Sequence, residues 1–297
     1  MDHPSPPVPH HTYSWLVQRF VLTLTCADQA GIVLAAAKGI VNADGNIVES
    51  DQYSDPPTGL FCMRIGFDSP RGLDEVRRAV GTELDRFTPL LGVRPESQRR
   101  RVLVMVSRVD HCLVDLLYRW NIGELPVDIP VIVSNHPDCA PVADRYAIPF
   151  VHIPVSPDTK DVAETELLKL VDQHGIDFIV LARYMQVLTP GLCDTLSGRV
   201  VNIHHSFLPG FSGAKPYHQA YDRGVKLIGA TAHYVTKDLD EGPIIGQDVI
   251  DVTHAHSPED LVAMGRDIER TVLARAVRLQ AEDRVFLAGK RAIVFSA

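Results

Sequence analysis

The chain has 297 residues, of which 45% are hydrophobic, and its formal net charge is -8 at pH 7. This length and composition suffice for one large hydrophobic core or two of ordinary size, which excludes a wholly disordered chain. The basic residues are scattered along the sequence, whereas a nucleic-acid-binding surface needs them concentrated. Small molecules are therefore the expected partners, with no nucleic acid and no membrane.

The five cysteines lie far apart and form no C-x-x-C pair. This pattern predicts neither a disulfide framework nor a zinc site, and we expect a cytoplasmic protein in a reducing environment. Residues 1–14 are rich in Pro and His and show no hydrophobic period, so they predict a flexible tail. They also lack the charged and apolar regions of a targeting sequence.

Residues 15–95 predict a small α/β domain. Apolar strand-like runs and segments of helical spacing follow one another in the order βαββα, as in a ferredoxin-like domain. The expected elements are a strand at 19–26, a loop and helix at 28–43, strands at 45–54 and 60–67, and a helix at 73–87.

Residues 96–297 predict a larger second domain. The segment 94–101 is dominated by charged and polar side chains and is typical of a domain linker. Beyond it, short apolar strands alternate with helical segments, which indicates a doubly wound, mostly parallel sheet. An amphipathic helix is expected at 258–284, with Ser257 as its N-cap, followed by a closing strand near 291–295.

The richest polar cluster of the sequence follows the strand expected at 200–204. In open α/β sheets, ligands bind outside the carboxyl ends of the strands. Asn202 and His204 alternate on this strand, so their side chains project to the same face, whereas His205 is expected to point elsewhere. The alternative is that Asn202 and His204 only hydrogen-bond the following loop.

The run from Asn202 to Val249 resembles the signature of the folate-dependent formyltransferases. Those transferases have Pro after the catalytic histidine, whereas this chain has His205 and an insertion-like segment at 212–221. Both features are similar to the deformylase branch of that family. The resemblance implies hydrolysis of 10-formyltetrahydrofolate to formate and tetrahydrofolate, in one-carbon and purine metabolism, with no cofactor. A metal site could be assembled from His204, His205, His233 and Asp240, but strand alternation separates the adjacent histidines and no H-x-x-x-H helix is present, so we expect no metal.

The resemblance implies that Asn202, His204 and Asp240 act together on the formyl group. Attack on an amide-like formyl carbon places negative charge on oxygen, so hydrogen-bond donors must face that oxygen. Asn202 and a protonated His204 are donors of this kind. A carboxylate beside the imidazole would favour its protonated form and could orient or deprotonate the attacking water, which is the role expected of Asp240.

Further site residues are implied by the same resemblance. His233 is expected to support the site near Asp240, the alternative being a buried core histidine. The segment after the strand at 177–182 is similar to the pterin-binding loop of the family, although such an apolar run could also belong to the core. The matching residues of this loop are Arg183, Met185, Val187 and Leu188.

A hydrolase must admit water while offering no productive site to a larger amine. His205, Lys215 and Tyr217 depart from the transferase pattern, and we hypothesise that they enforce this selection.

The N-terminal domain resembles an ACT domain, in which backbone groups at the start of a helix hold an amino acid. Asp28, Gly31, Ile32 and Asn46 would form this effector site. The alternative is that Asp28 caps the helix and Gly31 permits a close approach, without any ligand. Small sheets of this kind commonly pair between subunits, so we expect a homo-oligomer.

Two other functions remain open on the sequence. One is a formyltransferase that uses an amine acceptor, and the other is a non-catalytic sensor of folate and amino acids. The set of Asn202, His204 and Asp240 argues against the sensor.

Overall fold

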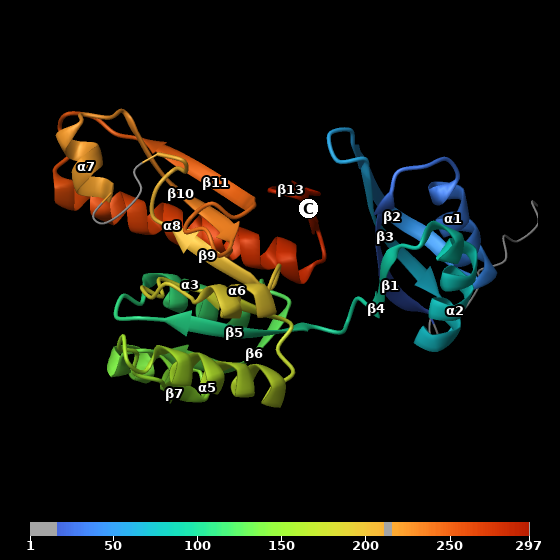
Figure 1. The fold of residues 1–297 in the computed structure, drawn as a ribbon, viewed down its shortest axis with the longest axis horizontal. Helices are drawn as coiled ribbons and strands as arrows, with labels where there is room; N and C mark the ends of the chain where they lie inside the picture. The colour runs from blue at the N-terminus through green and yellow to red at the C-terminus, as the bar shows by residue number, and fades with distance from the viewer. Residues whose placement is uncertain (1–16, 211–215, 297) are drawn as a thin grey trace, which may run out of the picture. The chain divides into compact units, whose positions relative to one another are not determined.

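A computed structural model of the chain describes residues 17–210 and 216–296 (Figure 1). The chain divides into two compact units, with the boundary between Gln98 and Arg99. The predicted tail at 1–14 and the predicted role of Lys215 lie outside the described residues. Within the described ranges, no helix has the length and apolar character needed to cross a membrane.

The N-terminal unit is a four-stranded antiparallel sheet covered by two helices, in strand order β2-β3-β1-β4 (Figure 1). Its elements are β1 (Gln18–Ala27), α1 (Ile32–Asn42), β2 (Asn46–Asp55), β3 (Leu60–Ser69), α2 (Leu73–Leu84), the 3-10 turn η1 (Asp85–Phe87) and β4 (Leu90–Pro95). Helices α1 and α2 pack closely because Gly39 has no side chain: a Cβ there would lie 2.7 Å from Val80 Cα. Apolar residues of both helices and of the sheet share one core.

Strand β4 extends the predicted βαββα order by one element. It pairs with β1, with Val93 opposite Leu22. The sequence concealed this strand because Gly92 weakens strand propensity. A Cβ at this position would lie 2.5 Å from Thr23 Oγ1, so a larger residue would force the Thr23 side chain to move. Pairing with β1 therefore stabilises this strand, although its own sequence has a low strand propensity.

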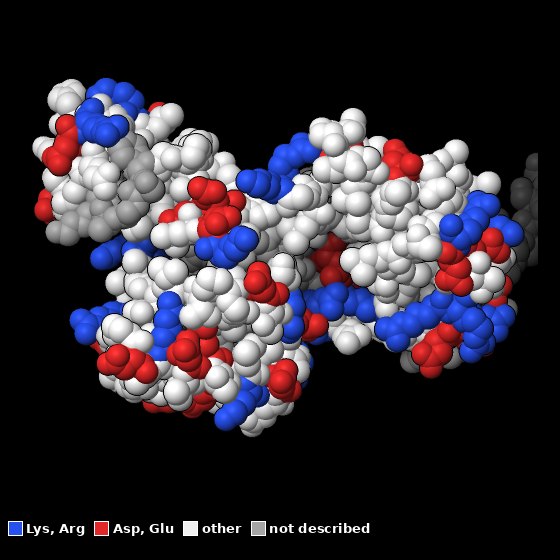
Figure 2. All heavy atoms as spheres, in the orientation of Figure 1, with Lys and Arg blue, Asp and Glu red and all other residues white. Residues whose placement is uncertain are grey.

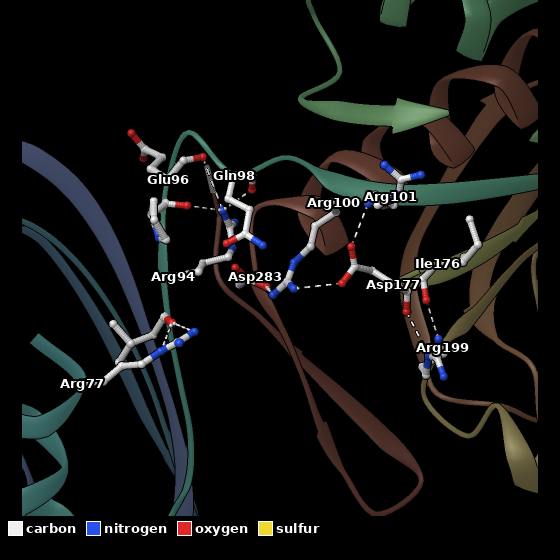
Figure 3. A network of polar contacts seen from close by, with 12 residues as sticks. Arg77, Arg94, Glu96, Gln98, Arg100, Arg101, Ile176, Asp177, Arg199 and Asp283 are labelled. Carbon is white, nitrogen blue, oxygen red and sulfur yellow. Dashed lines mark hydrogen bonds and ion pairs between the residues drawn. The ribbon is translucent and has the colours of Figure 1, made fainter. Parts of the chain in front are cut away.

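The segment 94–101 is more ordered than a linker. Arg94 is a buried residue within β4, which ends at Pro95, and its guanidinium donates to the carbonyl oxygens of Pro95, Glu96 and Gln98 at 3.1, 3.3 and 3.0 Å (Figure 3). Arg100 begins β5 (Arg100–Val106). Only the residues from Glu96 to Arg99 connect the two strands.

The second unit contains a seven-stranded sheet in the order β11-β10-β9-β8-β5-β6-β7 (Figure 1). The five strands from β9 to β7 are parallel, while β10 and β11 are antiparallel to their neighbours. Besides β5, the sheet comprises β6 (Val127–Ser134), β7 (Phe150–His152), β8 (Phe178–Leu181), β9 (Val200–His204), β10 (Leu227–Tyr234) and β11 (Ile244–Asp251). The expected mostly parallel sheet is confirmed.

Helices cover both faces of this sheet. They are α3 (His111–Asn121), the 3-10 turn η2 (Pro137–Cys139), α4 (Ala140–Arg145), α5 (Lys160–Gln173), α6 (Pro190–Thr195), α7 (Pro216–Asp222) and α8 (Pro258–Ala281). Alternate residues of β5 point into two separate cores. Val104 packs in the core that α3 and α8 contribute to, and Leu103 in the core of α5 and α6. This two-sided burial explains why β5 is continuously apolar from Val102 to Val106.

The C-terminal elements correct one predicted boundary and identify the partner of the predicted closing strand. Helix α8 begins at Pro258 as predicted, with a capping box between Ser257 and Asp260, but it ends at Ala281 rather than at 284. The predicted closing strand is β13 (Arg291–Val294), and it pairs with β12 (Val285–Ala288) in a separate hairpin instead of closing the main sheet.

An arginine network connects the start of the second unit to later segments. Arg100 forms ion pairs with Asp177 at 3.3 Å and with Asp283 at 2.6 Å (Figure 3). The Asp177 carboxylate also accepts a hydrogen bond from Arg101 N at 2.7 Å, and Arg199 donates to the Asp177 carbonyl at 3.0 Å. These contacts fix the amino end of β5 against the loops before β8 and β9.

Charges on the visible surface are mixed. Lys and Arg side chains lie beside Asp and Glu side chains on the face shown in Figure 2, and no single basic patch dominates it.

Candidate active site

A cavity of about 560 Å³ is lined by the carboxyl ends of β8, β9 and β10 and by the loops that follow β8 and β10. Its volume is within the range of small-molecule sites. Its polar and titratable lining residues are His111, Arg183, Tyr184, Gln186, Asn202, His204, His205, Tyr217, His218, His233, Thr236, Lys237, Asp240, Arg266 and Glu269. The cavity therefore combines the predicted strand-end cluster with side chains from α3, α7 and α8.

The structure brings Asn202, His204 and Asp240 together, with His233 between them. His204 Nδ1 lies 3.3 Å from Asp240 Oδ2, and His233 Nε2 lies 3.8 Å from Asp240 Oδ1. Asn202 and His233 are opposite one another in the β9–β10 pair, and Asn202 Nδ2 lies 3.2 Å from His233 Nε2. Antiparallel pairing thus places the two strands' polar side chains against one carboxylate.

Asp240 is held in an unusual backbone conformation. Its φ is 59°, in the left-handed region that non-glycine residues rarely adopt. The turn around it passes very close to β10, because a Cβ at Gly242 would lie 1.7 Å from the Tyr234 carbonyl oxygen. Strained backbone of this kind clusters at functional sites, where the surrounding structure enforces it. Here the close turn aims the Asp240 carboxylate at the two histidines.

The hydrogen bonds define the form of His233. Its Nδ1 donates to the Tyr234 carbonyl at 2.9 Å, which leaves Nε2 to accept from the Asn202 amide. Burial lowers the pKa of His233, against the effects of Tyr234 and Asp240. A neutral His233 therefore orients the Asn202 side chain, whose second N–H can bind a ligand oxygen.

Asp240 stays ionised in this environment. A hydrogen bond from His204 is the main cause of its lowered pKa, against partial desolvation. His204 is almost fully buried, and its Nε2 has no hydrogen-bond partner among the residues that the structure describes. An orphaned ring nitrogen beside a cavity is available to a substrate.

His205 departs from the sequence-based expectation, because it lines the same cavity as His204. The strand ends at His204, so strict alternation no longer applies to the next residue. The two rings meet edge to face, with centroids 5.0 Å apart. Burial, followed by the positive charges of Arg183 and His204, lowers the pKa of His205 to about 4.

The loop expected to contact the pterin also lines the cavity. Arg183 has a φ of 64°, and its carbonyl accepts from Ser107 N at 3.3 Å. Met185 and Val187 are more than half exposed, which argues against their being core residues, whereas Leu188 is buried. The loop therefore offers apolar side chains to the cavity while remaining anchored to the sheet.

The sequence analysis missed Glu269 and His111. Glu269 lies on the buried face of α8 with 1% exposure and contacts His111, Tyr217 and Arg183. The available signal was a carboxylate on the apolar stripe of an amphipathic helix, because such a residue is rarely buried without partners. Its partners come from distant parts of the chain, and the local pattern could not name them.

One group of potential metal ligands occurs among the described residues. Ligand atoms of His111, Cys112 and Glu269 lie within 4.8 Å of one another. However, Arg183 Nε lies 3.5 Å from Glu269 Oε2 and already balances that charge. A hydrogen-bonded cluster explains this grouping better than a cation site.

The four predicted effector residues of the N-terminal unit do not all face the solvent. Asp28, Gly31 and Asn46 are exposed, whereas the Ile32 side chain is buried in the core. The alternative role of Asp28 as a helix cap is wrong: the N-cap of α1 is Gly31, at a φ of 95°, and no side chain caps the helix. Only glycine adopts this conformation without strain.

Comparison with known proteins identifies the family. The family described as formyl transferase matches residues 100–277. A protein of Corynebacterium sp. (strain P-1) named formyltetrahydrofolate deformylase is 49% identical over 279 residues, which cover 93% of this chain and 98% of that protein. The chain belongs to the formyltetrahydrofolate deformylase family. The resemblance stated from the sequence is thereby confirmed.

Solved structures agree with this family. The crystal structure of formyltetrahydrofolate deformylase from Burkholderia mallei has a TM-score of 0.91 and 48% identity, covering 94% of this chain and all of that chain. Glycinamide ribonucleotide transformylase 1 from Symbiobacterium toebii is similar at a TM-score of 0.63 and 29% identity, covering 67% of this chain and 95% of that one. Deformylase family members and transformylases thus share much of one fold.

Proposed function

We propose that this chain hydrolyses 10-formyltetrahydrofolate to formate and tetrahydrofolate in the cavity of its second unit. The observation that carries the proposal is the convergence of Asn202, His204 and Asp240 on that cavity. The names of the relatives, which align over nearly the whole chain, support the same reaction.

The reaction adds water to the formyl carbon and breaks its bond to N10, which takes up a proton. We assign the second N–H of Asn202 and the unpartnered Nε2 of His204, both on residues that line the cavity, as donors for the formyl oxygen, on which charge develops. The ionised Asp240 holds His204 through Nδ1. Asp240 also offers an oxygen that can orient or deprotonate water.

The folate is expected to lie along the loop at 183–188. Met185, Val187 and Leu188 provide apolar surface for the pterin, and backbone groups of the loop can read its polar edge. The donor carries its own reactive formyl group, so the proposal requires no cofactor.

The N-terminal unit is proposed to be an ACT-like regulatory domain. Asp28, Gly31 and Asn46 are accessible to an amino-acid effector, and the backbone of Gly31 and Ile32 opens helix α1. We also propose that two such units pair in a homo-oligomer and that the protein is cytoplasmic, in keeping with five free, buried cysteines. Calorimetric titration with amino acids, and sedimentation of the full chain, test these points.

The decisive experiment is incubation of the pure protein with 10-formyltetrahydrofolate alone. We expect formate and tetrahydrofolate in equal amounts without any added amine. Turnover only after addition of an amine would identify a formyltransferase. Binding without turnover under either condition would identify a folate sensor and overturn the proposal.

A further inference from the structure

A buried carboxylate organises the wall of the cavity beside His205. Glu269 accepts hydrogen bonds from Tyr217 OH at 2.7 Å and from His111 Nε2 at 2.8 Å, and Arg183 Nε lies 3.5 Å from its Oε2. We call these four residues the Glu269 cluster. They come from four separate segments: helix α8, helix α7, helix α3 and the loop after β8.

The cluster keeps Glu269 ionised despite its burial. Desolvation alone would raise the pKa of this carboxyl, but His111, Arg183 and Tyr217 together lower it. An ionised carboxylate without such partners would cost several kcal/mol in the interior. The partners are therefore held in place by the charge that they stabilise.

Gly265 makes room for Tyr217 in this cluster. A Cβ at Gly265 would lie 2.1 Å from Tyr217 Cζ and 2.4 Å from its hydroxyl oxygen. The Tyr217 ring therefore crosses α8 one turn before Glu269, in a space that only glycine leaves open. This close fit fixes the position of the ring, and not only of its hydroxyl.

Tyr217 and Arg183 in turn lie near His205. The Tyr217 ring stands edge to face with His205, with centroids 6.4 Å apart, and His204 packs on it at 5.0 Å. Arg183 is one of the charges that keep His205 unprotonated. No described residue makes a hydrogen bond to the imidazole nitrogens of His205. Burial keeps this imidazole neutral, and it lines the cavity next to His204 without a hydrogen-bond partner among the described residues.

We propose that His205 accepts a hydrogen bond from the attacking water, and that Glu269 is a positioning residue that holds His205 in place through Tyr217 and Arg183. The inference rests on the proposed hydrolysis and assigns the site that selects water. Water is small enough to use a fixed imidazole beside His204, and the rigid wall leaves a larger amine no equivalent place.

Hydroxylamine provides a test that separates this role from a purely structural one. It is a small, strong nucleophile, and it converts the formyl group to formohydroxamate while tetrahydrofolate is released. Formate and formohydroxamate are measured together after subtraction of the uncatalysed reaction. Loss of water orientation lowers formate alone, whereas general damage to the site lowers both products in parallel.

The first pair of variants is His205→Leu and His205→Gln. We expect His205→Leu to lower kcat for formate about a hundredfold, with KM for the folate changed less than about threefold. The ratio of formohydroxamate to formate should rise at least about tenfold. His205→Gln, whose amide oxygen can accept a hydrogen bond, should restore part of the formate.

The second pair is Glu269→Gln and Asp267→Asn. Both replace a carboxylate of α8 by its amide, but Asp267 is exposed and pairs only with Arg270 among the described contacts. Glu269→Gln should raise the product ratio about three- to tenfold, and Asp267→Asn should leave it at the wild-type value. An unchanged ratio in the His205 and Glu269 variants, or a parallel fall of both products, overturns the inference. Absence of formate from the wild-type protein overturns the proposed function itself.

Discussion

The cavity contains two carboxylates that differ in almost every physical respect. Asp240 lies in a strained turn, its side chain is 18% exposed, and its partners are two histidines at 3.3 and 3.8 Å. Glu269 lies within a long helix, its side chain is 2% exposed, and its contacts include an arginine and a tyrosine. Asp240 can still accept a hydrogen bond from a reacting water, whereas the oxygens of Glu269 are already bound by neighbouring side chains.

This difference separates reacting groups from supporting ones. A catalytic group must exchange partners during turnover, so it is left incompletely paired. A supporting group is most effective when its partners are fixed, because it then reduces the freedom of the side chains around it. The variants below test whether the two carboxylates divide these tasks.

The largest effect is expected from Asp240→Asn. Loss of the charge beside His204 should lower kcat about a thousandfold, while the free energy of unfolding changes by less than about 1 kcal/mol. Steady-state kinetics and thermal unfolding measure the two quantities. A large loss of stability would show that Asp240 is a supporting group like Glu269.

Glu269→Ala should differ from Asp240→Asn in that its main effect is a loss of stability. Removing the carboxylate leaves Arg183 and Tyr217 buried without their partner, which should cost about 3 kcal/mol of unfolding free energy. The melting temperature should fall by about 10 °C, compared with little change for the exposed control Asp267→Ala. Unchanged stability would contradict the assignment of Glu269 as a structural centre.

Gly265→Ala tests the fit of Tyr217 against α8. The added methyl group would overlap the Tyr217 ring, and we expect a cost of about 1–3 kcal/mol. In a Tyr217→Ala background the same substitution should cost much less, because the space is free. Equal costs in both backgrounds would show that the ring does not depend on Gly265.

The smallest effect concerns pH and His205. Its pKa is about 4 in the folded protein, below the usual 6.5, so the unfolded chain binds more protons between these values. Stability should therefore fall as the pH drops from about 6.5 to 4, by on the order of 1 kcal/mol after allowance for solvent screening. His205→Gln should lack this acid-induced loss of stability, so its melting temperature should fall less than that of the wild type as the pH is lowered. The exposed-site control His254→Gln should remain parallel to the wild type.

Much of the fold was predictable because the spacing of apolar residues along the chain indicates which side chains are buried. Alternating cores on both faces make β5 and β8 continuously apolar, and the sequence shows this directly. Strand β4 escaped prediction because its pairing with β1, rather than its own composition, forms it. Strand β13 was predicted from its own sequence, but its pairing with β12 was not.

The sequence by itself determined that Asn202 and His204 share one face, since strand alternation is a local property, and the family resemblance added Asp240. Only the tertiary structure decided that His205 joins them, because the strand ends one residue earlier. It also decided that Glu269 meets Arg183 and Tyr217. Contacts between distant segments depend on how helices and strands pack, and a periodic pattern specifies which face is buried but not which residue it meets.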